Sequence, residues 1–209
     1  MKVESKMGRP REFDQDAALD AAMHVFWQKS YEGATMSDLT RAMGINRSSI
    51  YAAFGDKEAL FRRVMARYWA GPMTYMREAL EKPTLRQAAT SLLYGTVEFL
   101  SQPGQPRGCL TIQGALACGE DAEPIKQAAI LWRKSGEEAL RKRIFKARRD
   151  GELAKKTNPA ELARFLFTVM GGLGIQSANG ATRDQMKPVA DMALRALPIK
   201  ESTSVHRHS

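Results

Sequence analysis

The feature that most constrains the fold of this chain is a pair of short predicted helices joined at a glycine, within residues 35–57. The first helix carries apolar residues at helical spacing and stops at Gly44, because glycine readily adopts the left-handed conformation that helix ends often require. Asn46 is suited to cap the second helix, since its side chain can accept a hydrogen bond from a free amide of the first turn. The segment therefore predicts two short helices that meet at a tight turn.

The second of these helices has an apolar face and a polar face. The apolar face is expected to carry Ile50, Tyr51 and Phe54, which recur at helical spacing. Arg47, Ser48 and Ser49 are too small or too polar for a core, and they offer a thin hydrogen-bonding surface that suits the major groove of DNA. Helix pairs of this kind also occur in all-helical proteins of other functions, so the flanking sequence is needed to decide between the two.

The flanks supply a bracing helix, predicted over residues 14–29, and a further helix that begins after Asp56. Short motifs follow one another in a fixed order across residues 8–68: Gly8-Arg9-Pro10-Arg11, Phe26-Trp27, Gly33-Ala34-Thr35, Ala42-Met43-Gly44-Ile45, Ile50-Tyr51, Phe54 and Lys57-Glu58. This order resembles the TetR family of bacterial one-component transcriptional regulators. Beyond residue 68 only the number and length of the helices compare.

The resemblance implies roles for individual residues of the helix pair. In the family, the residues matching Thr35, Tyr51 and Lys57 contact phosphates, and the short second helix enters the major groove. Here that helix begins after Asn46 and presents Arg47, Ser48 and Ser49. An arginine that offers two donors to guanine O6 and N7 is the commonest base-specific contact, so Arg47 is the expected base reader.

An extended basic arm precedes the first helix. Arg9 and Arg11 lie on either side of Pro10, a composition that favours an extended chain able to follow the minor groove. The alternative is a disordered terminus that only improves solubility. Arg9 and Arg11 are therefore candidate DNA contacts.

The net charge of the chain is +9, which suits a polyanionic partner, although charge alone says nothing about fold. Residues 1–70 contain eleven Lys and Arg against nine acidic residues, so the predicted DNA-binding part contributes only +2. The richest basic run spans residues 133–149 and has the spacing of an amphipathic helix. Its charges predict a solvated helix face, and a second surface for nucleic acid is the alternative.

The pattern beyond residue 68 is helical throughout and predicts an all-α protein of about nine helices. Three regions are expected: residues 1–56 with the arm and the helix-turn-helix, residues 57–199 as a larger helical domain, and residues 200–209 as a disordered tail. A helix that starts near Lys57 meets Gly71-Pro72 and resumes toward Glu81, and a shorter helix is expected over residues 108–118. The bend at Gly71-Pro72 is a candidate point of coupling between the domains.

The last two predicted helices form a hairpin, with one apolar stripe on each helix. In proteins that resemble this chain, these helices pair with their copies in a second subunit, and a two-fold dimer reads an inverted-repeat operator. The alternative is that the stripes are ordinary core. The candidate interface residues are Phe165, Val169, Met170, Leu173, Val189, Ala193 and Leu197.

The resemblance also implies that the middle helices bind a small-molecule effector, whose preference for one arrangement of the dimer would shift the separation of the DNA-binding heads. The alternative is that the same side chains are only core packing. The candidate pocket residues are Thr96, Phe99, Cys109, Gln113, Leu116 and Trp132.

Other function classes have weaker support in the sequence. Cys109 and Cys118 are too few for a disulfide framework, and they are expected to be small buried residues, with a metal or redox sensor as the alternative. A nonspecific nucleic-acid binder would show aromatic residues among its cations, whereas here the aromatic residues follow core stripes. No phosphate loop, paired-histidine motif or nucleophile elbow is present, so we expect no enzyme activity, cofactor or bound metal. No apolar run reaches the roughly 20 residues of a spanning helix, and a cytoplasmic protein is expected.

Overall fold

The computed structural model describes residues 13–114, 119 and 122–200, which form ten helices and no β-strand. The helices are α1 (Gln15–Gly33), α2 (Met36–Met43), α3 (Arg47–Phe54), α4 (Lys57–Ala70), α5 (Thr74–Leu80), α6 (Leu85–Leu100), α7 (Leu110–Gln113), α8 (Glu123–Arg149), α9 (Pro159–Ala178) and α10 (Arg183–Ala196). The all-α prediction is confirmed.

The helix count exceeds the expected nine by one because the chain breaks between α4 and α5. Pro72 lacks an amide hydrogen and its ring disfavours a helical residue before it, so the helix stops at Ala70 and resumes at Thr74. The helix expected over residues 108–118 is confined to the single turn of α7 within the described residues, and Cys118 lies outside them.

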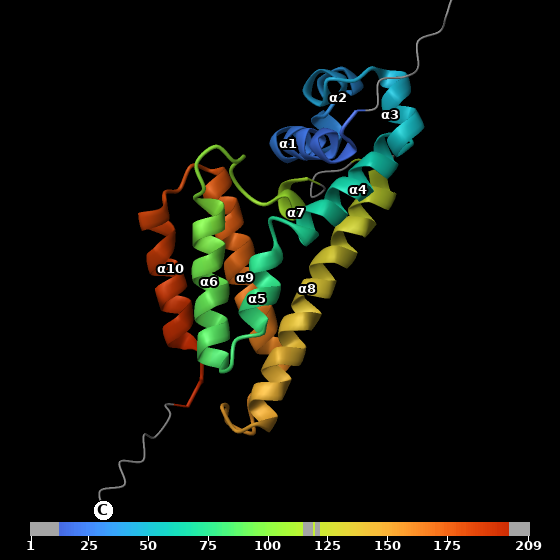
Figure 1. Ribbon diagram of the computed structural model, residues 1–209. Helices are drawn as coiled ribbons and strands as arrows, with labels where there is room; N and C mark the ends of the chain where they lie inside the picture. The colour runs from blue at the N-terminus through green and yellow to red at the C-terminus, as the bar shows by residue number, and fades with distance from the viewer. Residues whose placement is uncertain (1–12, 115–118, 120–121, 201–209) are drawn as a thin grey trace, which may run out of the picture.

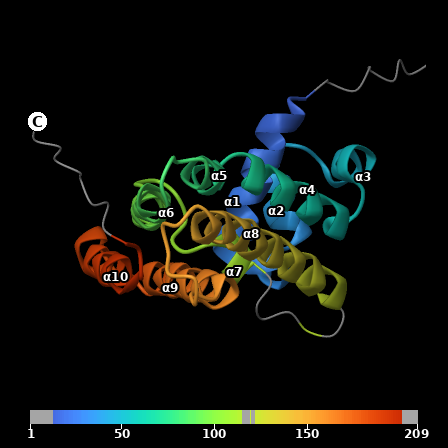
Figure 2. The ribbon, with the colours of Figure 1, turned by 90° about the horizontal axis from the view of Figure 1, so that it is seen from below.

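The helices divide into a small head and a larger body, joined by α4. Figure 1 shows α1, α2 and α3 gathered at one end, with α4 leading from them toward the body. The longest helix, α8, runs from beside α4 to the opposite end of the molecule. In the view of Figure 2, α9 and α10 lie on the side of the body away from α3.

Aromatic side chains make one continuous core across the head and the body. Phe26 of α1 meets Phe61 of α4 edge to face, with ring centroids 5.0 Å apart. One residue further along α1, Trp27 meets Tyr68 of α4 at 5.0 Å and stacks on Phe99 of α6 at 5.6 Å. Because edge-to-face and offset pairs add to the hydrophobic gain of burial, the head is packed firmly against the body.

Polar contacts reinforce the junction between head and body. The indole Nε1 of Trp27 donates to the carbonyl of Gly108, 3.1 Å away, and the amide of Tyr31 donates to the carbonyl of Gly114 at 2.9 Å. The guanidinium of Arg67 on α4 binds both carboxylate oxygens of Asp20 on α1. This bidentate contact lowers the pKa of the Asp20 carboxyl below its usual value. The body therefore holds α1 through both backbone and side-chain contacts.

Replacement of Trp27 by phenylalanine is expected to lower the free energy of unfolding by about 1–2 kcal/mol, because the buried Gly108 carbonyl loses its donor. Trp69→Phe is the matched control, since the buried indole Nε1 of Trp69 has no partner among the described residues. Urea unfolding of both variants measures the difference. An equal loss of stability in the two variants would show that the Trp27 bond contributes nothing.

Helix α1 contains a break at the position where the predicted bracing helix ends. Asp14 caps its start, and the backbone leaves the helical region at Ser30, with φ 62° and ψ 176°. Non-glycine residues rarely adopt a positive φ. The break turns residues 31–33 toward α7 and so permits the Tyr31 contact with Gly114.

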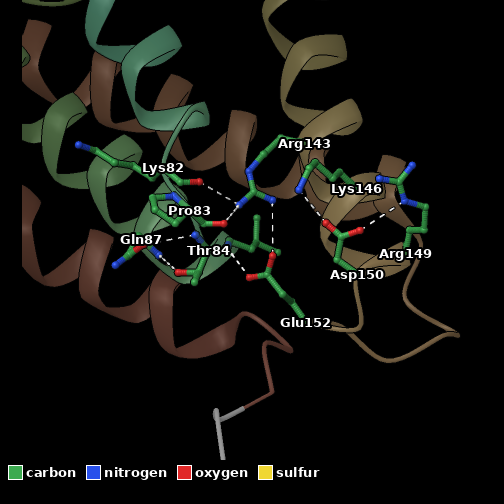
Figure 3. A network of polar contacts seen from close by, with 10 residues as sticks. Lys82, Pro83, Thr84, Gln87, Arg143, Lys146, Arg149, Asp150 and Glu152 are labelled. Atoms are coloured by element: carbon green, nitrogen blue, oxygen red, sulfur yellow. Dashed lines mark hydrogen bonds and ion pairs between the residues drawn. The ribbon is translucent and has the colours of Figure 1, made fainter.

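A buried arginine on α8 fixes the loop that joins α5 and α6 (Figure 3). The guanidinium of Arg143 donates to the carbonyls of Lys82 and Pro83, both 3.2 Å away. Its Nη1 lies 3.7 Å from Oε1 of Glu152, at ion-pair distance, and Oε2 of Glu152 accepts a hydrogen bond from the Leu85 amide. The C-terminal end of α8 is thereby tied to the start of α6.

The described part of the chain ends on a fixed backbone contact. Lys200, expected to open the tail, donates its amide to the carbonyl of Glu152, and Leu153 forms an isolated antiparallel bridge with Ile199. The remainder of the predicted tail lies outside the described residues. None of the helices in the described ranges is long and apolar enough to cross a membrane.

Candidate nucleic-acid interface and cavity

Local capping bonds set the geometry of the predicted helix-turn-helix. The Thr35 hydroxyl accepts a hydrogen bond from the Asp38 amide, and the Asp38 carboxylate accepts one from the Thr35 amide. The two bonds close a capping box at the start of α2. Gly44 ends α2 in the left-handed conformation, with φ 67°. The Asn46 side chain then accepts the Ser49 amide at 2.8 Å and starts α3. The predicted Asn46 cap and glycine turn are confirmed, and the capping box at Thr35 is an addition that was not predicted.

The exposed face of α3 carries a linked pair of predicted DNA contacts. The Arg47 guanidinium lies over the Tyr51 ring, 5.4 Å from its centroid, and Nη2 donates to the Tyr51 hydroxyl at 3.0 Å. The Ser48 hydroxyl donates to Oδ1 of Asn46 at 2.7 Å. The structure thus brings the expected base reader and an expected phosphate contact together, one helical turn apart.

The remaining predicted phosphate contacts flank α3. Lys57 is the first residue of α4, and its Nζ lies 4.6 Å from the centroid of the Tyr31 ring. Thr35 caps the start of α2, where its hydroxyl donates to Asp38. Lys29 also donates a hydrogen bond to the Asp38 carboxylate. The bonds from Lys29 and Thr35 hold the pKa of the Asp38 carboxyl well below its usual range, and the bond from Lys29 has the largest effect. Arg9 and Arg11 lie outside the described residues.

A cavity of about 420 Å³ lies within the body, inside the range typical of small-molecule sites. Three predicted pocket residues, Thr96, Phe99 and Cys109, line it. The described residues that line it are Trp69, Met73, Tyr75, Met76, Thr96, Phe99, Leu100, Cys109, Thr111, Ile112, Arg133, Phe167, Thr168, Met170, Gly171, Gly172 and Ile175.

Two predicted pocket residues lie elsewhere. Trp132 stacks on Trp69 with ring centroids 5.8 Å apart and is not part of the lining. Gln113 belongs to α7 but its side-chain amide lies against Gly108, where a Cβ atom would stand 2.2 Å from Oε1. Leu116 lies outside the described residues. Helical spacing does not fix which side of a helix faces a cavity between several helices, and this explains why these two residues do not line it.

Most polar side chains inside the cavity are paired with one another. The Tyr75 and Thr96 hydroxyls lie 3.2 Å apart, and Thr96 also donates to a carbonyl of its own helix. The Cys109 thiol lies 2.9 Å from the Thr111 hydroxyl and accepts a hydrogen bond from Tyr68 at 3.4 Å. Burial raises the pKa of Tyr68 and of Tyr75, so both phenols are neutral.

Arg133 is the lining residue of greatest chemical interest that sequence reasoning missed. The basic run predicts a solvated charge at this position, yet the Arg133 guanidinium lines the cavity and donates to the carbonyl of Thr111. A signal was available, because Ala129, Arg133, Gly136 and Leu140 follow one another at helical spacing on the inner side of α8.

The predicted dimer residues separate into two groups. Met170, Leu173, Ala193 and Leu197 are buried within the chain, because they pack α9 and α10 against the rest of the body. Phe165 and Val189 are exposed, and Val169 is half-buried. Val169 and Val189 also line a groove between α9 and α10. The sequence did not single out Ile175 and Met192, which are 48% and 64% exposed on the same helices.

Comparison with known proteins matches both parts of the chain. Residues 18–64 match the family model described as bacterial regulatory proteins, tetR family, and residues 88–191 match the model described as tetracyclin repressor-like, C-terminal domain. The HTH-type transcriptional repressor ComR of Escherichia coli is 30% identical over 199 residues, covering 94% of each chain. The HTH-type transcriptional repressor BdcR of the same organism is 30% identical over 192 residues, covering 91% of this chain and 92% of BdcR.

The fold comparison agrees. A solved structure of the TetR family transcriptional regulator CifR, a cysteine mutant complexed with 26-bp double-strand operator DNA, is 40% identical with a TM-score of 0.88. The alignment covers 91% of this chain and 100% of that one. The capped helix pair, the all-helical body and these relatives lead to one identification: the chain belongs to the TetR family of bacterial regulatory proteins and is a DNA-binding transcriptional regulator.

Proposed function

We propose that this protein is a ligand-responsive repressor: a homodimer that binds an inverted-repeat operator and leaves it when a small molecule fills the cavity of the body. The observation that carries the proposal is the pair of hydrogen bonds made by the backbone of Gly108. Its carbonyl accepts a hydrogen bond from the indole of Trp27 on the head helix α1, and its amide donates one to the hydroxyl of Ser177 on α9. One backbone unit beside the cavity thus connects the DNA-binding head to a predicted dimer helix.

The cavity lies next to this connection. Cys109, which follows Gly108 in the chain, lines the cavity and also accepts the Tyr68 hydroxyl of α4. A ligand that displaces Cys109 or α7 would therefore act on both α1 and α4. Release from DNA requires only that the ligand bind one arrangement of the heads better than the other.

The exposed apolar residues of α9 and α10 support the dimer. Phe165, Ile175, Val189 and Met192 leave large apolar side chains on one pair of neighbouring helices. Apolar groups gathered in this way mark interaction surfaces more often than isolated ones do. Pairing through these helices would place two copies of α3 for the two half-sites of an operator.

Footprinting on genomic fragments, including the DNA next to the protein's own gene, tests the proposal. We expect protection of an inverted repeat, and sedimentation equilibrium should give the mass of a dimer. Protection of a single unrepeated site, or a monomeric mass at the concentration of the footprint, would overturn the dimer part. Loss of protection on addition of metabolite pools would identify fractions that contain the effector.

Lys57→Ala is expected to weaken binding to operator and to random DNA alike, by about 1 kcal/mol at moderate salt, because a phosphate contact is independent of sequence. The slope of log affinity against log salt should fall by about 0.9 for each phosphate that Lys57 no longer neutralises. Fluorescence anisotropy at several salt concentrations measures both quantities.

Lys142→Ala is the matched control for Lys57, because Lys142 is an exposed lysine of the basic run on α8. An unchanged slope in this control agrees with a solvated α8 face. A slope that falls in Lys142→Ala but not in Lys57→Ala would favour the alternative of a second nucleic-acid surface on α8.

A second candidate is a regulator that senses oxidants or electrophiles through Cys109. It is favoured by the place of the thiol in the cavity, in contact with Thr111 and with Tyr68 of α4. CifR in the solved operator complex carries substitutions of its own cysteines. Those substitutions describe CifR and are not evidence about Cys109 of this chain. Within the described ranges, no group of three His, Cys, Asp or Glu residues is placed to hold a metal, so a thiol mechanism is the form proposed. Cys109→Ser should abolish a response to oxidant if this candidate holds.

A further inference from the structure

We propose that the cavity of the body selects a small anionic amphiphile, a molecule with one carboxylate-type head and an apolar body, and that Arg133 binds the head. The inference deepens the proposed function, since it rests on the cavity being the effector site. It concerns the chemical class of the ligand, which the position of the cavity alone does not determine.

Some hydrogen-bond donors in the described lining of the cavity have no acceptor within the described residues. The inner hydroxyls and the thiol are paired within the chain: Tyr75 with Thr96, and Cys109 with Thr111. The Arg133 guanidinium has five N–H donors, and its single acceptor within the described ranges is the carbonyl of Thr111. A ligand with acceptor atoms would bind the remaining N–H groups of Arg133.

A second donor in the lining also lacks an acceptor. The indole Nε1 of Trp69 is buried and has no hydrogen-bond partner among the residues that the structure describes. Buried donors without partners are costly, and the usual explanation is a missing water, ion or ligand. Two unmatched donors favour a ligand rich in acceptors over one rich in donors.

The charge of the cavity favours an anion. Among the described residues of the lining, Arg133 is the one basic residue and none is Asp or Glu. No ion pair joins Arg133 to a carboxylate anywhere in the described part of the chain. The side chain is partly removed from water, and this burial lowers the pKa of its guanidinium. A half-buried cation without a carboxylate partner gains most from an anionic ligand, and arginine binds carboxylates with two parallel bonds.

The remaining lining residues determine the polarity and size of the part of the ligand that lies away from Arg133. Aromatic and aliphatic side chains dominate, among them Phe99, Phe167, Met170 and Ile175. At the roughly 30 Å³ that a water molecule occupies, the volume of about 420 Å³ holds about 14 groups of that size. An apolar body of one short chain or two fused rings, with a single carboxylate, fits this space.

Calorimetric titration of the full chain without DNA tests the class. The probes are 2-naphthoate and its uncharged isostere naphthalene-2-carboxamide, then decanoate and decanamide. Each pair has one shape and differs in charge. We expect each carboxylate to bind at least tenfold more tightly than its amide. Quenching of tryptophan fluorescence offers a second readout, because Trp69 lines the cavity.

Variants at position 133 assign the preference to Arg133. Arg133→Met should bring each carboxylate and its amide to equal affinity, and Arg133→Lys should restore most of the preference, since it keeps the charge. Lys134→Met is the matched control, because Lys134 is exposed on the same helix and does not line the cavity. It should keep the full preference. Thermal unfolding without ligand checks that each variant is folded.

The outcomes separate this inference from the proposed function. Equal affinity for carboxylate and amide in the unaltered protein, a preference that survives Arg133→Met, or no saturable binding of either carboxylate would overturn the inference. Carboxylate binding that depends on Arg133 but leaves operator affinity unchanged would support the anion site and contradict ligand-driven release. An effector later found to be uncharged, bound in the same cavity, would support release and overturn the anion site.

Discussion

Replacement of Arg47 by alanine is expected to weaken binding to the cognate operator by about 1–3 kcal/mol for each half-site, because the variant cannot form a bidentate bond with a guanine. A dimer uses two copies of α3, so the losses at the two half-sites add when the sites are independent. Affinity for random DNA should change far less. Anisotropy titrations on the footprinted operator and on a scrambled duplex measure the two values.

The contact between Arg47 and Tyr51 adds a second expectation. In the free protein the guanidinium lies over the Tyr51 ring and donates to its hydroxyl. This contact holds the side chain on the exposed face of α3, so less rotamer freedom is lost on binding. Arg47→Lys keeps the charge but not the planar fork of donors, and should therefore lose operator affinity while it keeps affinity for random DNA.

Arg41→Ala is the control for loss of charge in the head. Arg41 is exposed in the last turn of α2, and it is not among the predicted base readers. If Arg47→Ala lowers operator and random binding by equal factors, as Arg41→Ala is expected to do, then Arg47 is a phosphate contact and the base reader lies elsewhere on α3.

The head could be predicted from sequence because its geometry is set by contacts between near neighbours. Asp14, Asn46 and Asp56 each cap a helix within three residues, and Gly44 turns the chain by its own conformation. Such signals lie within a few residues of the structure that they determine. Periodicity placed Tyr51 on the apolar face of α3, and this was wrong, because its ring is 42% exposed and lies beside Arg47, one helical turn away.

The cavity and the proposed dimer face could be predicted only in part, because they depend on contacts between distant segments. Leu173 and Ala193 are buried between helices of the same chain, and this could not be known before the packing of α9 and α10 was seen. Apolar periodicity identifies a face that avoids water but does not say whether the same chain or a partner covers it. Arg133 shows the same limit for a charged residue, since a basic run looks solvated until α7 is placed beside it.

Arg143→Met is expected to lower the free energy of unfolding by about 3 kcal/mol, because it removes one partner of a largely buried ion pair. The carbonyls of Lys82 and Pro83 would lose a shared donor, and the Glu152 carboxylate would lose its cation. For a chain of this size such a loss corresponds to a fall in Tm of about 6–12 °C. Thermal and urea unfolding measure it.

Arg141→Met is the matched control, two residues away on the same helix. Its ion pair with Glu138 is about 40% exposed on both sides, whereas the Arg143 side chain is 8% exposed. Exposed pairs of this kind contribute less than about 1 kcal/mol. If the two methionine variants unfold with equal free energies, the network of Figure 3 does not hold the loop between α5 and α6.

A double replacement separates the ion pair from the loop contacts. Arg143→Met combined with Glu152→Met leaves no unpaired charge, so its cost should be smaller than the sum of the two single costs. The free energy of unfolding that the double variant still loses comes from three groups that lose their partners: the carbonyls of Lys82 and Pro83 and the Leu85 amide. Costs that add without coupling would mean that Arg143 acts on the loop carbonyls alone and that the Glu152 carboxylate stabilises only the start of α6.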